Sequence, residues 1–411
     1  MFLVSRLVEF LPFFFPLYLF RFDILGIPTN LTEIIIWLVG CIFIIEIIAT
    51  QRFNFFNIWK NNSKIFWPAL FFLLAISLTI FITVPKELIF FDGIDERTIA
   101  TFRIALGQWK GFVFTPLIFL FLLRQAPLQN RIRAFNNFLI TAALLSIFSW
   151  GLVFFGKGFT ADLRLAGPFE SANYLTLFLA PALAGIIPQI LNDRKKKLNW
   201  LIGGIILAGI IGTRSYAAWL AVGSTIFIFF LWQLHFNWNW RKIIITFFIL
   251  AGIFTTQIGS EKFTNFLNFS QRSSTTVRLE VWQIAFNLIR ENFIFGIGPG
   301  QFETQYLQNA HAILGRIPIE WVMLHPHNFF LTTWLSAGIL GLSAMLWLII
   351  NFFRLVKEKV KQQSSKLINS EKVIIISATL AFLTILLHGL VDTPFWKNDL
   401  ALIWWLIIGM V

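Results

Sequence analysis

The sequence predicts an all-α polytopic membrane protein, and three observations support this class. Hydrophobic residues make up 57% of the 411 positions and charged residues only 13%, whereas a soluble domain carries about 25% charged residues. The mean hydropathy is +0.75. Apolar stretches long enough to cross a bilayer recur along the chain. These features exclude a soluble globular enzyme, a disordered chain and a fibrous protein, and the single Cys41 can form neither an intrachain disulfide nor a zinc cluster.

About twelve segments are candidates for membrane-spanning helices, each approaching the roughly 20 apolar residues that a span needs. They are 7–22, 31–50, 65–84, 105–123, 135–155, 171–191, 199–213, 215–232, 243–258, 328–353, 373–391 and 398–411. Pro12 and Pro16 interrupt the first one, and neighbouring helices can compensate for prolines in a membrane. The whole chain, 1–411, is expected to form a single membrane domain.

The distribution of charge predicts the orientation of these helices. With the N-terminus in the cytoplasm, most of the 33 Lys and Arg residues fall on the cytoplasmic side and most of the 20 Asp and Glu residues fall outside. This asymmetry follows the positive-inside rule and accounts for the net charge of +13. Basic runs such as 194–197 are therefore interpreted as contacts with anionic lipid, and nucleic acid is not expected as a partner.

The longest segment between predicted spans is 259–327, which lies between the ninth and tenth spans on the outer side. Ser and Thr residues at 273–275 can cap a helix, and the apolar positions in 277–292 follow helical spacing. The turn 296–300, with three glycines and a proline, should end that helix, and a second short helix is expected over 301–311. We therefore predict a large, partly helical extracytoplasmic loop that covers a pocket in the membrane domain.

Polar residues gather where this loop meets the tenth span. A proline follows His325 and favours an extended conformation there, so His327 and Asn328 are expected at the start of the helix, at the membrane surface. A neutral imidazole at this place can accept a proton, and Asn328 can cap the helix or orient the ring. Gly338 and Gly341 further along would allow close contact between helices.

Three arginines at the outer edge of the predicted bundle supply the opposite chemistry. Arg164 precedes the sixth span, Arg214 separates the seventh from the eighth, and Arg278 lies in the loop helix, one turn before Trp282. A guanidinium remains charged and binds phosphate oxygens bidentately. Arginines that converge with a histidine on one outer cavity would suit a lipid pyrophosphate and a reacting hydroxyl.

Each of these features also has a structural interpretation. A lone histidine at a helix start is more often structural, arginines at a membrane edge commonly contact lipid, and the glycine turn can be plain loop geometry. His388 and Asp392, one turn apart near the outer end of the eleventh span, could pair or line a cavity. The histidines and acids lack the tight spacing of a metal site, so neither a metal nor a cofactor is expected.

Several blocks of the sequence resemble one known family. His327 and Asn328, followed after nine residues by Gly338 and Gly341, match the H-[NSQ]-x9-G-x-x-G pattern of O-antigen ligases. His325 with His327 and Asn328 resembles the His-x-His-Asn signature of the wider O-antigen ligase and polymerase superfamily. Further similar blocks are Arg164–Asn173, Thr213–Ala218 with departures at Thr213 and Tyr216, Arg278–Trp282, and Gly296–Gly300 including Gly298.

The resemblance implies a GT-C-like fold and an inverting, metal-independent glycosyltransferase in the cytoplasmic membrane. Its donor would be an undecaprenyl-pyrophosphate-linked oligosaccharide or polysaccharide, and its acceptor a hydroxyl of a lipid or saccharide at the outer face. His327 would be the general base, and Arg214 and Arg278, with Arg164, would hold the pyrophosphate. His325, Asn328, Trp282, Gly298, Gly300, Gly338 and Gly341 would support the site.

Two alternatives remain open at this stage. A repeat-unit polymerase of the same superfamily shares these blocks, while transfer to protein is less expected because the chain ends near its last predicted span. A transporter of small anions, attracted by the outer arginines, belongs to a different class. It would need inverted repeats or charged residues deep in the spans, and the middle of the predicted spans is dominated by Phe, Leu and Ile.

Overall fold

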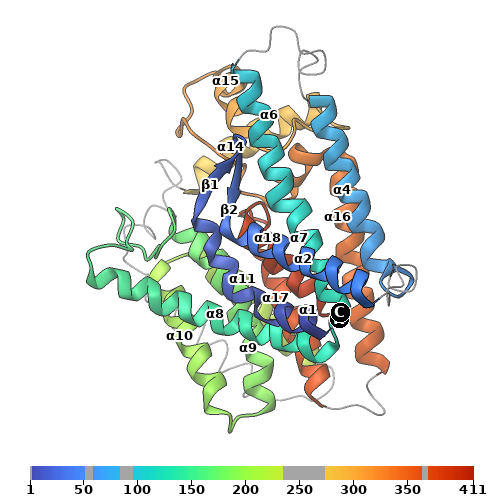
Figure 1. Ribbon diagram of the computed structural model, residues 1–411. Coiled ribbons are helices and arrows are strands. Elements are labelled where there is room, and N and C mark those ends of the chain that lie inside the picture. Colours follow the sequence, from blue (N-terminus) through green and yellow to red (C-terminus); the bar gives the residue numbers. More distant parts are fainter. Residues whose placement is uncertain (1, 51–58, 84–95, 235–273, 363–368) are drawn as a thin grey trace.

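The computed structural model describes residues 2–50, 59–83, 96–234, 274–362 and 369–411, and it is built almost entirely of helices (Figure 1). Within these described ranges, seven helices are long and apolar enough to cross a membrane, and three shorter apolar helices accompany them. The chain is therefore an all-α, multi-pass membrane protein, as the sequence predicts. The predicted span 243–258 lies outside the described residues.

The observed elements follow the predicted spans closely along most of the chain. In chain order they are α1 (Phe2–Phe10), η1 (Leu11–Leu19), β1 (Arg21–Ile24), β2 (Ile27–Asn30), α2 (Leu31–Thr50), α4 (Ser63–Thr83), α6 (Glu96–Gln108), η2 (Trp109–Phe114), α7 (Thr115–Gln125), α8 (Leu128–Phe154), α9 (Ala172–Asn192), α10 (Lys197–Thr213), α11 (Tyr216–Leu234), α14 (Ser274–Glu291), α15 (Phe302–Leu314), α16 (Phe329–Gln362), α17 (Asn369–His388) and α18 (Asn398–Gly409).

The N-terminal region differs from the single span predicted over 7–22. After α1 the chain tightens into η1, a 3-10 helix that contains Pro12 and Pro16, because proline cannot donate the hydrogen bonds of a continuous α-helix. The antiparallel hairpin of β1 and β2 follows, and the sequence analysis did not predict it. Positive φ angles at Leu25 and Gly26, 53° and 74°, make its tight turn.

Charged residues lie deeper in the bundle than the sequence analysis allowed. Lys110 sits in η2, a π-helical turn within the predicted fourth span, and its Nζ lies 2.9 Å from Glu33 Oε2. The same ammonium donates to Pro28 O at 2.6 Å and to Thr29 Oγ1 at 2.7 Å. The expectation of purely apolar span interiors is therefore wrong here. Because every donor of Lys110 has a protein acceptor, the pair links α2 to η2 as a structural contact.

The interior of the bundle is organised around α18, which lies among the other helices near the centre of Figure 1. From Asp399 to Gly409 this helix is buried on all sides, including Trp404 and Trp405. A helix that is apolar all round is suited either to such a core or to contact with lipid. Cys41 is a free thiol on the exposed side of α2, in agreement with a lipid-facing small residue.

The predicted helices of the large loop are present as α14 and α15, at the top of Figure 1. They share a hydrophobic cluster of their own, in which Val281 and Leu288 of α14 pack with Tyr306 of α15. Leu331 and Leu335 of α16 belong to the same cluster. The described part of the loop is therefore an ordered layer packed on the start of α16.

A kink in α16 receives the glycine turn of the loop. Gly338 has φ 65° and ψ −173°, which interrupts the helix, and this backbone region is almost restricted to glycine. The N–H groups of Ile297 and Gly298 donate to Leu335 O at 2.7 and 3.1 Å, and Ile339 N–H donates to Phe293 O at 3.2 Å. The kink therefore exposes backbone groups that bind the loop.

Replacing Gly338 by Ala is expected to destabilise the protein strongly. The new Cβ would collide with the carbonyl of Ile294 and would occupy a strained backbone conformation, a combination that costs at least about 3 kcal/mol. The melting temperature of the detergent-solubilised protein, with the folded fraction measured by size-exclusion chromatography after heating, checks this loss of stability. Gly204→Ala is the control, because a Cβ at that position meets nothing within 4 Å. Equal melting temperatures for the two variants would contradict the proposed role of the kink.

Candidate functional site

The site begins where Asn328 starts α16. Its Oδ1 accepts the N–H groups of Phe330 and Leu331 at 2.9 and 3.0 Å, which makes it the predicted helix cap. Its Nδ2 donates to Leu390 O at 2.8 Å, and Phe329 N–H donates to Gly389 O at 2.8 Å. The start of α16 is thereby tied to the segment that follows α17.

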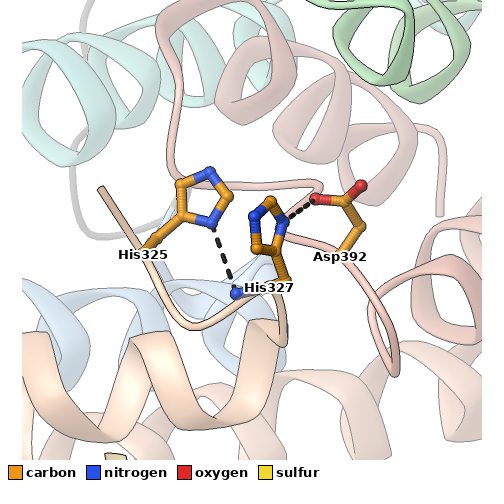
Figure 2. Close-up of side chains that lie close together, drawn as sticks. All are labelled: His325, His327 and Asp392. Carbon is orange, nitrogen blue, oxygen red and sulfur yellow. Dashed lines mark hydrogen bonds and ion pairs between the residues drawn. The ribbon is translucent and has the colours of Figure 1, made fainter. Parts of the chain in front are cut away.

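This link brings His327 to Asp392. His327 Nδ1 and Asp392 Oδ1 are 3.3 Å apart, as Figure 2 shows. The carboxylate side chain is 2% exposed and the imidazole 28% exposed, so the ring is the accessible member of the pair. Burial by itself would raise the pKa of Asp392, but the hydrogen bond and charge of His327, followed by His388 and His325, hold that pKa well below its usual range. An ionised carboxylate is thus positioned to orient the imidazole.

His325, which precedes Pro326 in the chain, packs its ring against the ring of His327. The two ring centroids are 4.5 Å apart, and the His325 Nδ1 accepts the N–H of His327 at 3.4 Å (Figure 2). Thr393 Oγ1 is 3.0 Å from the same nitrogen. Burial, with the neighbouring His327 as the next cause, lowers the pKa of His325 to about 3. His325 is therefore a neutral residue that fixes the backbone of His327.

This pKa predicts a specific dependence of stability on pH. Unfolded histidine titrates near 6.5, so the stability associated with neutral His325 is complete above that pH and is lost as the pH falls from 6.5 towards about 3. The slope is at most about 1.4 kcal/mol per pH unit. We expect His325→Gln to reduce the fall in melting temperature between pH 7 and pH 5. A fall equal to that of the wild type would contradict this assignment.

The loop helix α14 approaches the histidines through Trp282. Trp282 Nε1 donates to Pro326 O at 2.9 Å, between the two histidines. One turn earlier, Arg278 has only a long contact from Nη1 to Ser274 O at 3.5 Å, and its buried Nε has no hydrogen-bond partner among the described residues. Arg278 lies on the same helix one turn before Trp282, which contacts the backbone between the two histidines. The guanidinium therefore keeps donors available for an anion.

The other two arginines are arranged differently. Arg164 Nε donates to Thr213 O at 2.9 Å and Nη2 donates to Asn173 Oδ1 at 2.7 Å, so the position of this guanidinium is fixed by neighbouring segments of the protein. Arg214, which directly follows Thr213, caps the C-terminal end of α10 in a left-handed conformation with φ 49° and is exposed. Arg164 also interacts electrostatically with both Arg278 and Asp392. It therefore holds the segment that carries Arg214 while adding positive charge near the pair.

The glycines of the predicted site have structural positions. The N–H of Gly298 is already bound to Leu335 O, and a Cβ on it would meet Thr83 of α4. A Cβ on Gly300 would meet Ile104 of α6. The turn thus packs against α4 and α6, which agrees with the structural interpretation of plain loop geometry. A Cβ on Gly341 would lie 3.8 Å from Ala75 and from Phe72 of α4, so the two helices approach each other closely at this position.

Asp392 is a residue of the candidate site that the sequence did not pair with His327. From the sequence, Asp392 and His388 could pair or line a cavity. In the structure the Asp392 carboxylate contacts His327, and His388 Nε2 has no hydrogen-bond partner among the described residues. The two members of the observed pair are 65 positions apart. The only available signal was an acid at the end of a predicted span, which already suggests a functional group.

The tertiary structure also brings together three possible metal ligands, although their positions in the sequence gave no indication of a metal site. His325, His327 and Asp392 each offer a ligand atom, and these atoms lie within 4.8 Å of one another. Nδ1 of His325 accepts the His327 N–H, and Nδ1 of His327 faces Asp392. Hydrogen bonds among the three residues therefore account for their proximity.

Taken together, fold and site define a multi-pass membrane protein with a histidine–carboxylate pair beside an arginine-bearing loop. Residues 201–346 match the family described as O-antigen ligase. The O-antigen ligase of Salmonella typhimurium (strain LT2) is 31% identical over 179 residues, which cover 42% of this chain and 43% of that protein. The chain thus aligns with less than half of this relative. The resemblance to the O-antigen ligase and polymerase superfamily is confirmed, and the matched region includes Arg214, Arg278 and His327.

Proposed function

We propose that this protein is an inverting glycosyltransferase that moves an undecaprenyl-pyrophosphate-linked glycan onto an acceptor hydroxyl. The single observation that carries the proposal is the accessible His327 imidazole held by the buried Asp392 carboxylate. The unused donors of Arg278 supply the second element of the chemistry, a cation for the leaving group. The match to the O-antigen ligase family supports the same reaction class.

In this proposal His327 acts as the general base. Its Nδ1 carries the proton that is donated to Asp392, so Nε2 is free to accept the proton of the acceptor hydroxyl. The hydroxyl oxygen attacks the anomeric carbon while the bond to the pyrophosphate oxygen breaks, and the lipid pyrophosphate leaves with the electron pair. Attack opposite the leaving group inverts the anomeric centre. Asp392 stabilises the imidazolium that forms.

Arg278 and Arg214 bind the pyrophosphate in the proposed mechanism. Negative charge grows on the leaving oxygen in the transition state, and guanidinium groups held near it lower the barrier. Arg164 has a different task, because its guanidinium is held in place by Thr213 O and Asn173 Oδ1. It positions the segment of Arg214 and contributes charge to the site.

We propose no metal and no cofactor for this reaction. A base generates the nucleophile from the hydroxyl, and arginines neutralise the pyrophosphate, so both tasks have protein residues. The proposed location is the outer face of the cytoplasmic membrane, with a cytoplasmic N-terminus, a donor drawn from the membrane and a lipid or saccharide acceptor. Ligation of the glycan is proposed ahead of repeat-unit polymerisation because His327 to Gly341 match the ligase pattern.

The deciding experiment is transfer by the purified, full-length protein in lipid nanodiscs. Lipid-linked glycan is incubated with lipid A-core, with a second lipid-linked glycan or with neither, each in the presence and absence of EDTA. Transfer to lipid A-core that persists in EDTA supports ligation without a metal, whereas elongation of the lipid-linked glycan supports the polymerase. Absence of transfer to either acceptor, together with uptake of a small anion into proteoliposomes, would replace the proposal by the transporter.

A further inference from the structure

A lysine, Lys397, lies close in the chain to Asp392 of the histidine–carboxylate pair. Lys397 follows Asp392 by five residues and immediately precedes α18. Its Nζ is 3.6 Å from the centroid of the Tyr174 ring, 4.6 Å from that of Phe169 and 4.9 Å from that of Tyr18. Three aromatic rings from three different segments thus surround one ammonium, which we call the Lys397 cage.

The cage leaves the donors of Lys397 unused. Among the described residues, the ion pairs do not include Lys397, and the ring faces offer no hydrogen-bond acceptor of ordinary strength. Cation–π contact stabilises the charge, but an ammonium also has three N–H donors. Lys397 is half-buried, and a charge that is partly removed from water is stabilised by a hydrogen-bond acceptor. An acceptor from outside the chain would therefore stabilise it.

Lys110 provides the comparison within the same molecule. It is also enclosed by the bundle and also lies near an aromatic ring, with Nζ 5.5 Å from the centroid of Trp37. Its three donors, however, meet Glu33, Pro28 O and Thr29 Oγ1. Lys110 is therefore complete without a ligand, whereas Lys397 is not.

The Lys397 cage shares its supporting segments with the proposed active site. Asn173, which holds Arg164, precedes Tyr174 of the cage. Lys397 interacts electrostatically with both His325 and Asp392. Burial lowers the pKa of Lys397 to about 8, an effect that Asp399 opposes, so the side chain is still mainly protonated at pH 7. A positive charge is therefore held next to the reacting groups.

We propose that Lys397 binds a phosphate group of a substrate at this site, as a cation additional to the arginines. The inference rests on the function proposed above and adds a residue outside the matched region 201–346. Phosphate is the chemistry that fits, because its oxygens accept several charge-assisted hydrogen bonds from one ammonium. The phosphate belongs either to the donor pyrophosphate or to a phosphorylated acceptor, and the test separates these two sources.

The first measurement is binding of geranylgeranyl pyrophosphate to the full-length protein in nanodiscs. Loss of a charge-assisted contact should weaken binding by about 10- to 100-fold in Lys397→Met, and Lys397→Arg should restore part of it. Lys157→Met is the matched control, since Lys157 is exposed on a loop. The second measurement is the KM for lipid-linked glycan and for phosphorylated lipid A-core in the transfer assay. An increase for only one of them identifies the source of the phosphate.

The wild-type protein offers a test that does not depend on folding of a variant. Acetylation of Lys397 by N-acetoxysuccinimide, read by mass spectrometry, should slow when geranylgeranyl pyrophosphate or phosphorylated acceptor is bound. If neither ligand protects Lys397 and Lys397→Met changes no Kd and no KM, Lys397 is only a structural contact. In that outcome the transferase stands as long as His327→Ala abolishes transfer, whereas a wild type without transfer removes the proposed function itself.

Discussion

Replacing His327 by Ala is expected to abolish glycan transfer while the protein remains in the membrane at its normal level. Removal of a general base reduces the rate by about 10²- to 10⁴-fold, and His327 is the accessible ring of the observed pair. The rate is measured in the nanodisc assay, with membrane abundance measured by immunoblot. His311→Ala is the matched control, because His311 is exposed on α15.

Asp392→Asn tests the same pair from its buried side. An amide can no longer stabilise the imidazolium, and it can hold the ring in the wrong tautomer, so kcat should fall while the KM values remain close to those of the wild type. The variant also keeps the size of the side chain, which limits damage to the fold. Full activity of His327→Ala, or an unchanged kcat in Asp392→Asn, would refute the general-base assignment.

Replacing Arg278 by Ala is expected to weaken both the binding of the lipid-linked glycan and the stabilisation of its pyrophosphate as it leaves. The guanidinium has unused donors at the site, and loss of charge-assisted hydrogen bonds to a buried phosphate corresponds to about 10- to 100-fold in binding. The KM for lipid-linked glycan should rise, and kcat should fall, because charge on the leaving oxygen grows in the transition state. Arg278→Lys should recover part of the loss.

The control for Arg278 lies on the same helix. Arg290 is exposed near the end of α14, so Arg290→Ala removes an identical charge from the loop without touching the histidines. Equal effects of the two substitutions would mean that the loop acts through its overall charge, and the specific pyrophosphate contact would be disproved. A selective effect of Arg278→Ala, greatest at low donor concentration, agrees with direct binding.

Local sequence patterns were sufficient to predict the positions of most of the helices. The predicted span 31–50 coincides with α2, and 199–213 lies within α10, because the hydrophobic thickness of a bilayer sets the length of an apolar segment. The loop helix was predicted from capping residues and apolar spacing and is present as α14. These predictions depend only on interactions between residues that are close in the chain.

The predictions that were wrong or absent concern distant contacts. The first span failed at Pro12 and Pro16, where only neighbouring helices decide how the chain continues. The ion pair of Glu33 with Lys110 contradicted the expectation that no charged residues lie deep in the spans. The hairpin of β1 and β2 has no strong turn dipeptide, so its register was not readable from the sequence.

Composition and periodicity by themselves determined that this is a helical, multi-pass membrane protein, and the motif from His327 to Gly341 carried its resemblance to O-antigen ligases. Only the tertiary structure decided that Asp392 is the partner of that histidine and that Arg164 is held by Thr213 and Asn173. It also decided that Arg278 Nε has no hydrogen-bond partner among the described residues and that three aromatic rings surround Lys397. The physical reason is the range of the interactions. Hydropathy and helix capping act within a few residues, whereas a hydrogen bond across 65 positions exists only after the helices have packed.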